Sequence, residues 1–116
     1  MKHKTIRNHR DFITSKDDIL EQSVCFNLKI KNQSVPGEIR YGIIASKRVF
    51  RTAVDRNLAK RKMRDWIAYN EELMNLNVDY IFFVNEQILD YPRDIGRKDV
   101  REAMENIADA YNNQDV

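Results

Sequence analysis

The side chains that could do chemistry in this chain of 116 residues are mainly cations, and they gather in one short stretch. Between residues 47 and 64, eight basic side chains are opposed only by Asp55, a balance of +7. The eight are Lys47, Arg48, Arg51, Arg56, Lys60, Arg61, Lys62 and Arg64. Like charges at this density repel one another, so they favour a polyanionic partner such as nucleic acid. The alternative interpretation is a helix face that is merely solvated.

The net charge of +2 hides this cluster, because the two halves of the chain have opposite signs. Residues 1–64 carry 16 basic and 6 acidic side chains, whereas residues 65–116 carry 4 basic and 12 acidic ones. The sequence therefore predicts an electrically polarised molecule.

Residues suited to protein-borne catalysis are sparse. His3 and His9 lie near the N-terminus, and the sequence has no further histidine to complete a catalytic triad. Cys25 is the single cysteine and has no candidate base near it in sequence, which predicts a structural thiol and leaves no second thiol for a disulfide or metal cage. We expect no catalytic side chain and no metal held by the protein.

Length and hydropathy favour one soluble domain. A chain of 116 residues allows one compact domain over residues 1–116 and hardly two. The first ten residues, MKHKTIRNHR, lack an apolar signal core, and the longest apolar run is Tyr80–Val84. A membrane span needs about 20 such residues. We expect a cytoplasmic protein without a membrane segment.

A long amphipathic helix is predicted to carry most of the cations. Thr52, followed three residues later by Asp55, matches a capping box, so the helix should run from Ala53 to about Asn70. At about 100° per residue, an apolar arc and a polar arc lie side by side. The apolar arc holds Ala59, Met63, Trp66 and Ile67, and the polar arc holds Asn57, Lys60, Arg61 and Arg64.

The segments before this helix predict a shorter helix and two strands. Asn8 resembles an N-cap and predicts a helix over about residues 9–16. Strict alternation over residues 24–31, with Cys25 on the polar side, is typical of a half-buried strand. A loop over residues 32–37 then predicts a hairpin, whose second strand covers residues 39–45 and pairs antiparallel with the first.

The segments after the long helix predict a central strand and a final helix. Residues 78–84 are apolar on both faces apart from Asp79, and residues 85–97 read as a polar connection. The final helix has an apolar stripe formed by Val100, Ala103, Met104, Ile107, Ala108 and Tyr111. The fold class is α+β, a small two-layer α/β sandwich in the order αββ(β)αβα.

These elements predict a track of phosphate contacts. Two cations should end a strand and a third should precede the long helix, where the free N–H groups of the first turn add partial positive charge. Arginine guanidinium groups, each with paired N–H donors, and one side-chain amide continue the series of phosphate contacts along the helix. The predicted RNA-binding residues are Lys47, Arg48, Arg51, Arg56, Asn57, Lys60, Arg61 and Arg64. Contact with about five phosphates of a single strand gives a slope of log affinity against log salt of about −3.5.

Aromatic side chains matter because unpaired bases stack on them. Phe12 lies on the predicted first helix beside Arg7 and Arg10, and it either stacks on a base or packs that helix onto the sheet. Trp66 lies on the apolar arc and is predicted to belong to the core.

The segment GIIASKRVFRTAVDRNLAKRKMRDW, residues 42–66, resembles the signature region of the bacterial ribonuclease P protein subunit. That family has a strand ending in a basic pair, here Lys47-Arg48, followed by a helix that carries Arg-Asn-Arg-x-x-Lys-Arg-x-x-Arg in varying forms. The helix here reads RNLAKRKMR over residues 56–64. Asp11-Phe12 and Tyr80–Val84 match further features, so the resemblance covers about residues 8–108.

The resemblance implies an accessory subunit of a ribonucleoprotein endonuclease, a hydrolase of tRNA processing whose partners are a catalytic RNA and precursor tRNA. The RNA performs Mg²⁺-dependent removal of the 5′ leader, and Mg²⁺ is bound mainly by RNA. On this interpretation the helix residues Arg56, Asn57, Lys60, Arg61 and Arg64 face the catalytic RNA. Phe12 and the sheet form a cleft for the leader. The family fold, like domain 2 of ribosomal protein S5, implies a left-handed βαβ crossover, against the general rule.

Three residues depart from the family pattern. Leu58 replaces the second arginine of Arg-Asn-Arg, Asn85 follows the apolar strand where a basic residue is frequent, and Lys16 stands where a second aromatic is frequent. An alternative function is a general RNA-binding module of ribosomal-protein type without a processing role. A DNA-binding helix is less favoured, because no short helix precedes it as in a helix-turn-helix.

Overall fold

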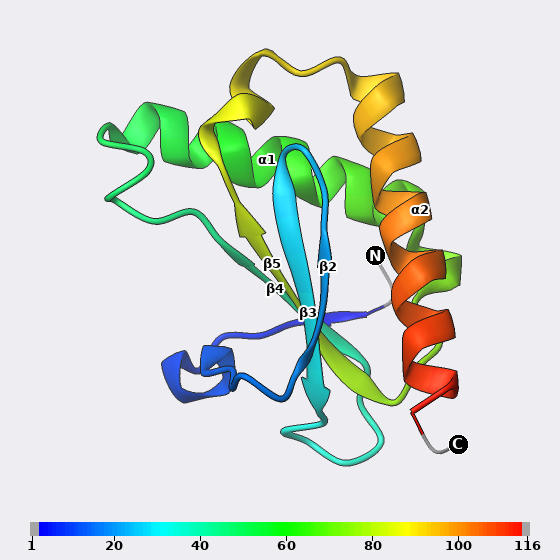
Figure 1. Cartoon of the computed structure of the whole chain (residues 1–116). Coiled ribbons are helices and arrows are strands. Elements are labelled where there is room, and N and C mark those ends of the chain that lie inside the picture. Colours follow the sequence, from blue (N-terminus) through cyan, green and yellow to red (C-terminus); the bar gives the residue numbers. More distant parts are fainter. Residues whose placement is uncertain (1–2, 115–116) are drawn as a thin grey trace.

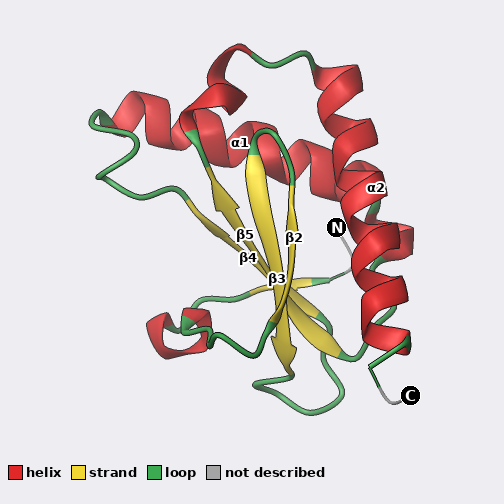
Figure 2. Cartoon of the chain, in the orientation of Figure 1, coloured by secondary structure: helices red, strands yellow, loops and turns green. Residues whose placement is uncertain are grey.

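A five-stranded mixed sheet, with two long helices packed on one face, forms the framework of the computed structural model, which describes residues 3–114 (Figures 1 and 2). The strands are β1 (Lys4–Thr5), β2 (Ile19–Gln22), β3 (Phe26–Asn32), β4 (Arg40–Ile44) and β5 (Val78–Val84). The α-helices are α1 (Ala53–Tyr69) and α2 (Arg93–Asn112). Three 3₁₀ helices complete the chain: η1 (His9–Phe12), η2 (Glu71–Leu73) and η3 (Glu86–Asp90). The predicted α+β class is confirmed.

The strand order is β1-β4-β5-β3-β2, which places β5 at the centre as predicted. β4 and β5 are parallel neighbours joined through α1, whereas β3 pairs antiparallel with the other edge of β5. This parallel pair is the crossover that the family resemblance implies, and its left hand stays a prediction.

The predicted hairpin between residues 24–31 and 39–45 is wrong. β3 and β4 do not pair with each other, because β5 lies between them. The loop that we expected to be a tight turn instead crosses the end of β5, where Ser34 donates two hydrogen bonds to Asp79. A strand that is apolar on both faces is best satisfied by a neighbour on each edge, and local turn signals carry no information about an inserted strand.

The predicted helix over residues 9–16 shrinks to the four residues of η1. Its cap is confirmed, because the Asn8 side chain accepts a hydrogen bond from the Arg10 N–H, but the backbone of Ile13 is already extended. The two edge strands β1 and β2 were not predicted, since two and four residues are too few to show a clear period.

Two other boundaries differ from the prediction. β3 begins at Phe26, after a turn in which Cys25 is fully buried and Val24 is exposed, so Cys25 does not lie on the polar side. α2 begins directly after Pro92 and includes Gly96, a residue that the sequence reading assigned to a loop. The predicted polar connection is therefore mostly η3 and the first turns of α2.

The long helix α1 is as predicted, and its apolar arc anchors the core. The Thr52 hydroxyl accepts the Asp55 N–H at 3.1 Å, which confirms the N-cap. Ala59, Met63, Trp66 and Ile67 are the buried residues of α1. Trp66 is 1% exposed and lies at 6.0 Å, centroid to centroid, from Tyr91, so its predicted core role is confirmed. Among the described helices, none combines the length and apolar character that a membrane span requires.

Gly96 permits the close crossing of α1 and α2. A Cβ atom at Gly96 would overlap the ring of the buried Trp66. We expect Gly96→Ala to lower the free energy of unfolding by about 1–3 kcal/mol, the usual cost of overpacking. At an open helix position the same exchange stabilises by about 1 kcal/mol. Urea unfolding followed by circular dichroism measures the difference, and a more stable variant would contradict this packing.

Candidate nucleic-acid interface

The exposed side of α1 forms an open groove lined by cations and an amide. The groove is lined by Val54, Asn57, Leu58, Lys60, Arg61 and Arg64. These positions recur every three or four residues, so they share one flank of the helix, while the opposite flank is buried. Asn57, Lys60, Arg61 and Arg64 are four of the eight predicted RNA-binding residues, and the structure brings them together.

The groove cations are available to a ligand. Among residues 3–114, neither Arg61 nor Arg64 has a hydrogen-bond or ion-pair partner, and both are exposed. Arg40, Arg97 and Arg101 differ from them, because each of these three arginines is paired with a carboxylate. Unpaired guanidinium groups side by side are suited to phosphate oxygens, which they contact through paired N–H donors.

Acidic Asp65, next to this groove, is neutralised within the fold. Arg97 on α2 donates to both carboxylate oxygens of Asp65, at 3.2 and 3.0 Å, and its guanidinium lies 4.3 Å from the centre of the Tyr69 ring. The hydrogen bonds to Asp65 raise the pKa of Arg97 above its ordinary value. This pairing removes a negative charge that would otherwise repel a polyanion from α1.

The three predicted residues before the helix form a separate patch. Lys47, Arg48 and Arg51 are exposed in the loop between β4 and α1. Arg48 and Arg51 line a second open groove, which Asn85 also borders. The loop is held by the buried Phe50, which is 2% exposed. Predicted residues therefore line two open grooves, and the groove before the helix also contains Asp55 and Glu86.

Arg56 stands between these grooves and has a structural contact. Its guanidinium donates to the Phe50 carbonyl at 2.9 Å, which ties the first turn of α1 to the loop. Lys62, which we left out of the predicted site, donates to the carbonyls of Leu89 and Tyr91. The positions of the cations around α1 thus separate those that make contacts within the fold, Arg56 and Lys62, from those that face solvent.

Phe12 lies on the opposite face of the sheet from the two helices. Tyr41 of β4 belongs to the core, so the next residue, Gly42, points to the other face. A Cβ atom at Gly42 would collide with the half-buried Phe12 ring, whose Cζ atom would be 2.9 Å away. The ring therefore packs on the sheet while keeping part of its surface open.

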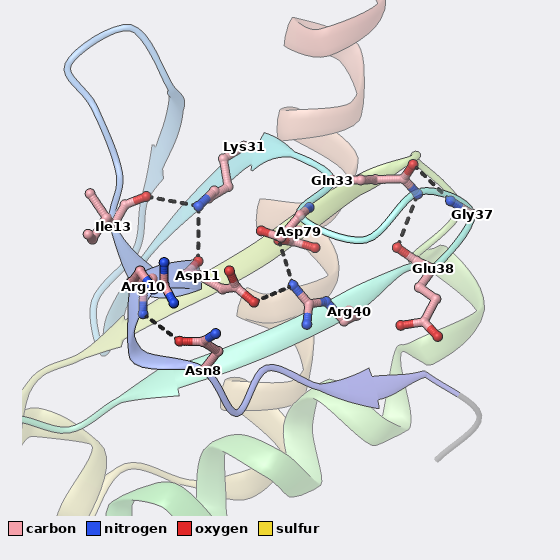
Figure 3. A network of polar contacts seen from close by, with 11 residues as sticks. Asn8, Arg10, Asp11, Ile13, Lys31, Gln33, Gly37, Glu38, Arg40 and Asp79 are labelled. Carbon is pink, nitrogen blue, oxygen red and sulfur yellow. Dashed lines mark hydrogen bonds and ion pairs between the residues drawn. The ribbon is translucent and has the colours of Figure 1, made fainter.

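Sequence reasoning missed a polar network beside Phe12, in which Arg40 lies between Asp11 and Asp79 (Figure 3). Arg40 is 7% exposed and Asp79 is fully buried. The sequence signal that could have indicated this network was a single charged residue at the start of each of two apolar strands. Their pairing needs the register that aligns Arg40 with Asp79 across β4 and β5.

The structure gives Cys25 no access to substrate. The thiol is fully buried, and burial, with a smaller contribution from Asp99, raises its pKa to about 11. Within the part of the chain that the structure describes, no three His, Cys, Asp or Glu side chains cluster as a metal site.

Comparison with known proteins relates this architecture to one family. The sequence model of the family described as Ribonuclease P matches residues 2–108. The chain belongs to the ribonuclease P protein family. It is accordingly a protein subunit of this endoribonuclease, and membership implies partnership with an RNA subunit. No curated protein matches the sequence.

Solved structures of RNase P proteins share the fold. The RNase P protein of Staphylococcus aureus is 22% identical with a TM-score of 0.70, over 90% of this chain and 94% of that chain. The RNase P protein of Thermotoga maritima is 17% identical with a TM-score of 0.65, over 78% of this chain and 84% of that chain. At these identities the similarity shows the architecture, and the S5-like strand arrangement is consistent with it.

We expect Arg61→Ala to weaken binding of a single-stranded RNA and to make the slope of log affinity against log salt about 0.7 less steep, since one phosphate contact is lost. Arg93→Ala, which removes an exposed arginine at the start of α2, is the matched control and should leave the slope unchanged. Fluorescence anisotropy at several salt concentrations measures both. Equal slopes for Arg61→Ala and the unmodified chain would contradict the assignment of the groove.

The buried Cys25 thiol should resist modification in the folded protein. Because it is buried and its pKa is about 11, we expect dithionitrobenzoate to react with it at least about a thousandfold more slowly at neutral pH than with the urea-unfolded chain. The absorbance of the released thiolate follows the reaction. Immediate, complete reaction of the folded chain would contradict the placement of Cys25.

Proposed function

We propose that this chain binds the catalytic RNA of ribonuclease P and the 5′ leader of precursor tRNA, and assists the Mg²⁺-dependent endonucleolytic removal of that leader in the cytoplasm. Family membership supports the role of an RNase P subunit. The observation that carries the proposal is the groove on α1, where three cations and Asn57 face outward together.

The α1 groove is the surface proposed for the catalytic RNA. Arg61 and Arg64 supply forked donors for phosphate oxygens, and Asn57 adds an amide that both donates and accepts. Leu58 lines the same groove, so the arginine missing from the family pattern removes one phosphate contact and leaves the others in place. An apolar side chain here still offers a surface for a ribose or base.

The opposite face of the sheet is proposed for the leader. Phe12 presents part of its ring there for stacking on an unpaired base. Lys29 and Lys31 alternate with the buried residues of β3, which places them on the same face as Gly42. A single strand needs such a combination of cations along its backbone and an aromatic platform for its bases.

Mg²⁺ in this proposal belongs to the RNA, whose phosphates hold it. Cationic side chains neutralise phosphates and release the counterions condensed around them. A protein that brings the Arg61 groove to the RNA therefore lowers the concentration of Mg²⁺ needed to fold it and to hold the substrate. Chemistry at the scissile phosphate needs no side chain of this chain.

Reconstitution with an RNase P RNA at low Mg²⁺ tests the proposal. We expect the chain to raise the rate of precursor-tRNA cleavage, and Arg61→Glu to abolish that stimulation because a carboxylate repels phosphate. Arg93→Glu makes the same charge change on α2, and this variant should still stimulate cleavage. A folded chain that leaves cleavage unchanged would contradict the proposal.

Binding selectivity separates this function from the general RNA-binding module. With the catalytic RNA present, a processing subunit favours precursor tRNA over leaderless tRNA, whereas a general module binds the two equally. The ratio of the two dissociation constants measures the difference. A ratio of one would favour the general module.

A further inference from the structure

Figure 3 shows an ionic network around Arg40. Arg40 and Gly42 alternate along β4 with the core residue Tyr41, so the network lies on the sheet face that carries Phe12. One terminal nitrogen of Arg40 is 3.0 Å from the Asp11 carboxylate and 3.4 Å from that of Asp79. The same Asp79 oxygen accepts hydrogen bonds from the Ser34 N–H and hydroxyl, at 3.2 and 2.7 Å. Three parts of the chain, η1, the β3–β4 loop and β5, therefore meet at Arg40.

This ionic network is not expected to add much to the stability of the fold. Burial disfavours a charge, and a buried ion pair is commonly no better than an apolar pair of the same volume. Burial alone would lower the pKa of Arg40, but the hydrogen bonds and negative charges of Asp11 and Asp79 together raise this pKa above its ordinary value, so the guanidinium stays charged. A buried ion pair of this kind gives a fixed geometry, because its donors and acceptors meet in one arrangement.

The ionic network fixes the conformation of the turn that carries Phe12. Arg40 holds the side chain of Asp11, the residue before Phe12. Lys31 of β3 donates to the backbone carbonyls of Asp11 and Ile13, both at 3.0 Å, so the turn is also held on the two sides of Phe12. In Figure 3, Arg40 and Lys31 approach η1 from two different strands.

Gly42 supplies the surface on which the ring rests. It is buried, and any Cβ atom at this position would displace the Phe12 ring. Since Gly42 has a negative φ and lies inside β4, its backbone conformation does not require glycine. Glycine is therefore needed at position 42 because it leaves space for the Phe12 ring.

We propose that Arg40, Lys31 and Gly42 are positioning residues that hold Phe12 as a fixed stacking platform for an unpaired base of the leader. This inference rests on the proposed function and adds to it how the platform is built. An aromatic ring that is already ordered pays less conformational entropy on binding than a mobile one. Arg40 and Gly42 thus raise affinity for the leader through Phe12, and Lys31 adds this positioning role to its positive charge on the same face.

Leader preference, the ratio of dissociation constants for leaderless and leader-bearing tRNA in the reconstituted holoenzyme, tests the inference. We expect Phe12→Ala to lower this ratio about fivefold or more, the effect of losing one stacked base. Gly42→Ala and Lys31→Met should lower it in the same direction. In a Phe12→Ala background, Gly42→Ala should have no further effect, because its target is gone.

Controls separate positioning from folding and from charge. Lys29→Met removes the same charge from the same face of β3. Within residues 3–114 the Lys29 ammonium makes only a 3.4 Å hydrogen bond to the Ser15 carbonyl, so this variant measures the effect of charge alone. Circular dichroism and affinity for the catalytic RNA should be unchanged in every variant used. If Gly42→Ala destabilises the fold, Lys31→Met compared with Lys29→Met decides the question.

The outcomes are distinct. Equal loss in Lys31→Met and Lys29→Met, or full leader preference in a folded Gly42→Ala variant, would overturn the positioning role. Full leader preference in Phe12→Ala would overturn the platform itself. Absence of any leader preference in the unmodified holoenzyme would instead contradict the proposed function.

Discussion

Repulsion among the cations on one flank of α1 is the constraint on which the rest of the structure depends. The helix tolerates it because the opposite flank, with Met63, Trp66 and Ile67, is buried in the core. Gly96 lets α2 approach the buried Trp66 closely, which fixes this flank of α1 against α2. Apolar packing thereby holds like charges together on one exposed flank of the helix.

Some charged residues outside the groove make contacts inside the fold. Arg97 neutralises Asp65 beside the groove, and Lys62 donates to two carbonyls before α2. On the other face of the sheet neither α1 nor α2 covers the strands, and Arg40 holds the N-terminal turn that carries Phe12. The two faces therefore differ in construction: one presents free cations, and the other holds an aromatic ring in place.

Patterns within short stretches of sequence predicted the helices and strands that such stretches define. The cap at Thr52 and the period of α1 gave the helix and its groove, and the apolar run of residues 78–84 gave the central strand. Strand order could not be predicted, because inserting β5 between β3 and β4 depends on contacts far apart in sequence. The partnership of Arg40 and Asp79 depends on that order and was missed with it.

Directed cleavage of the catalytic RNA most directly tests whether the α1 groove faces RNA. An iron–EDTA probe is attached to a cysteine introduced by Val54→Cys, a groove position that is 75% exposed, or by Glu105→Cys on the exposed side of α2; the buried Cys25 does not compete for the label. Our account predicts strong RNA cleavage from position 54 and little from position 105. Equal cleavage from both, or stronger cleavage from position 105, would contradict it.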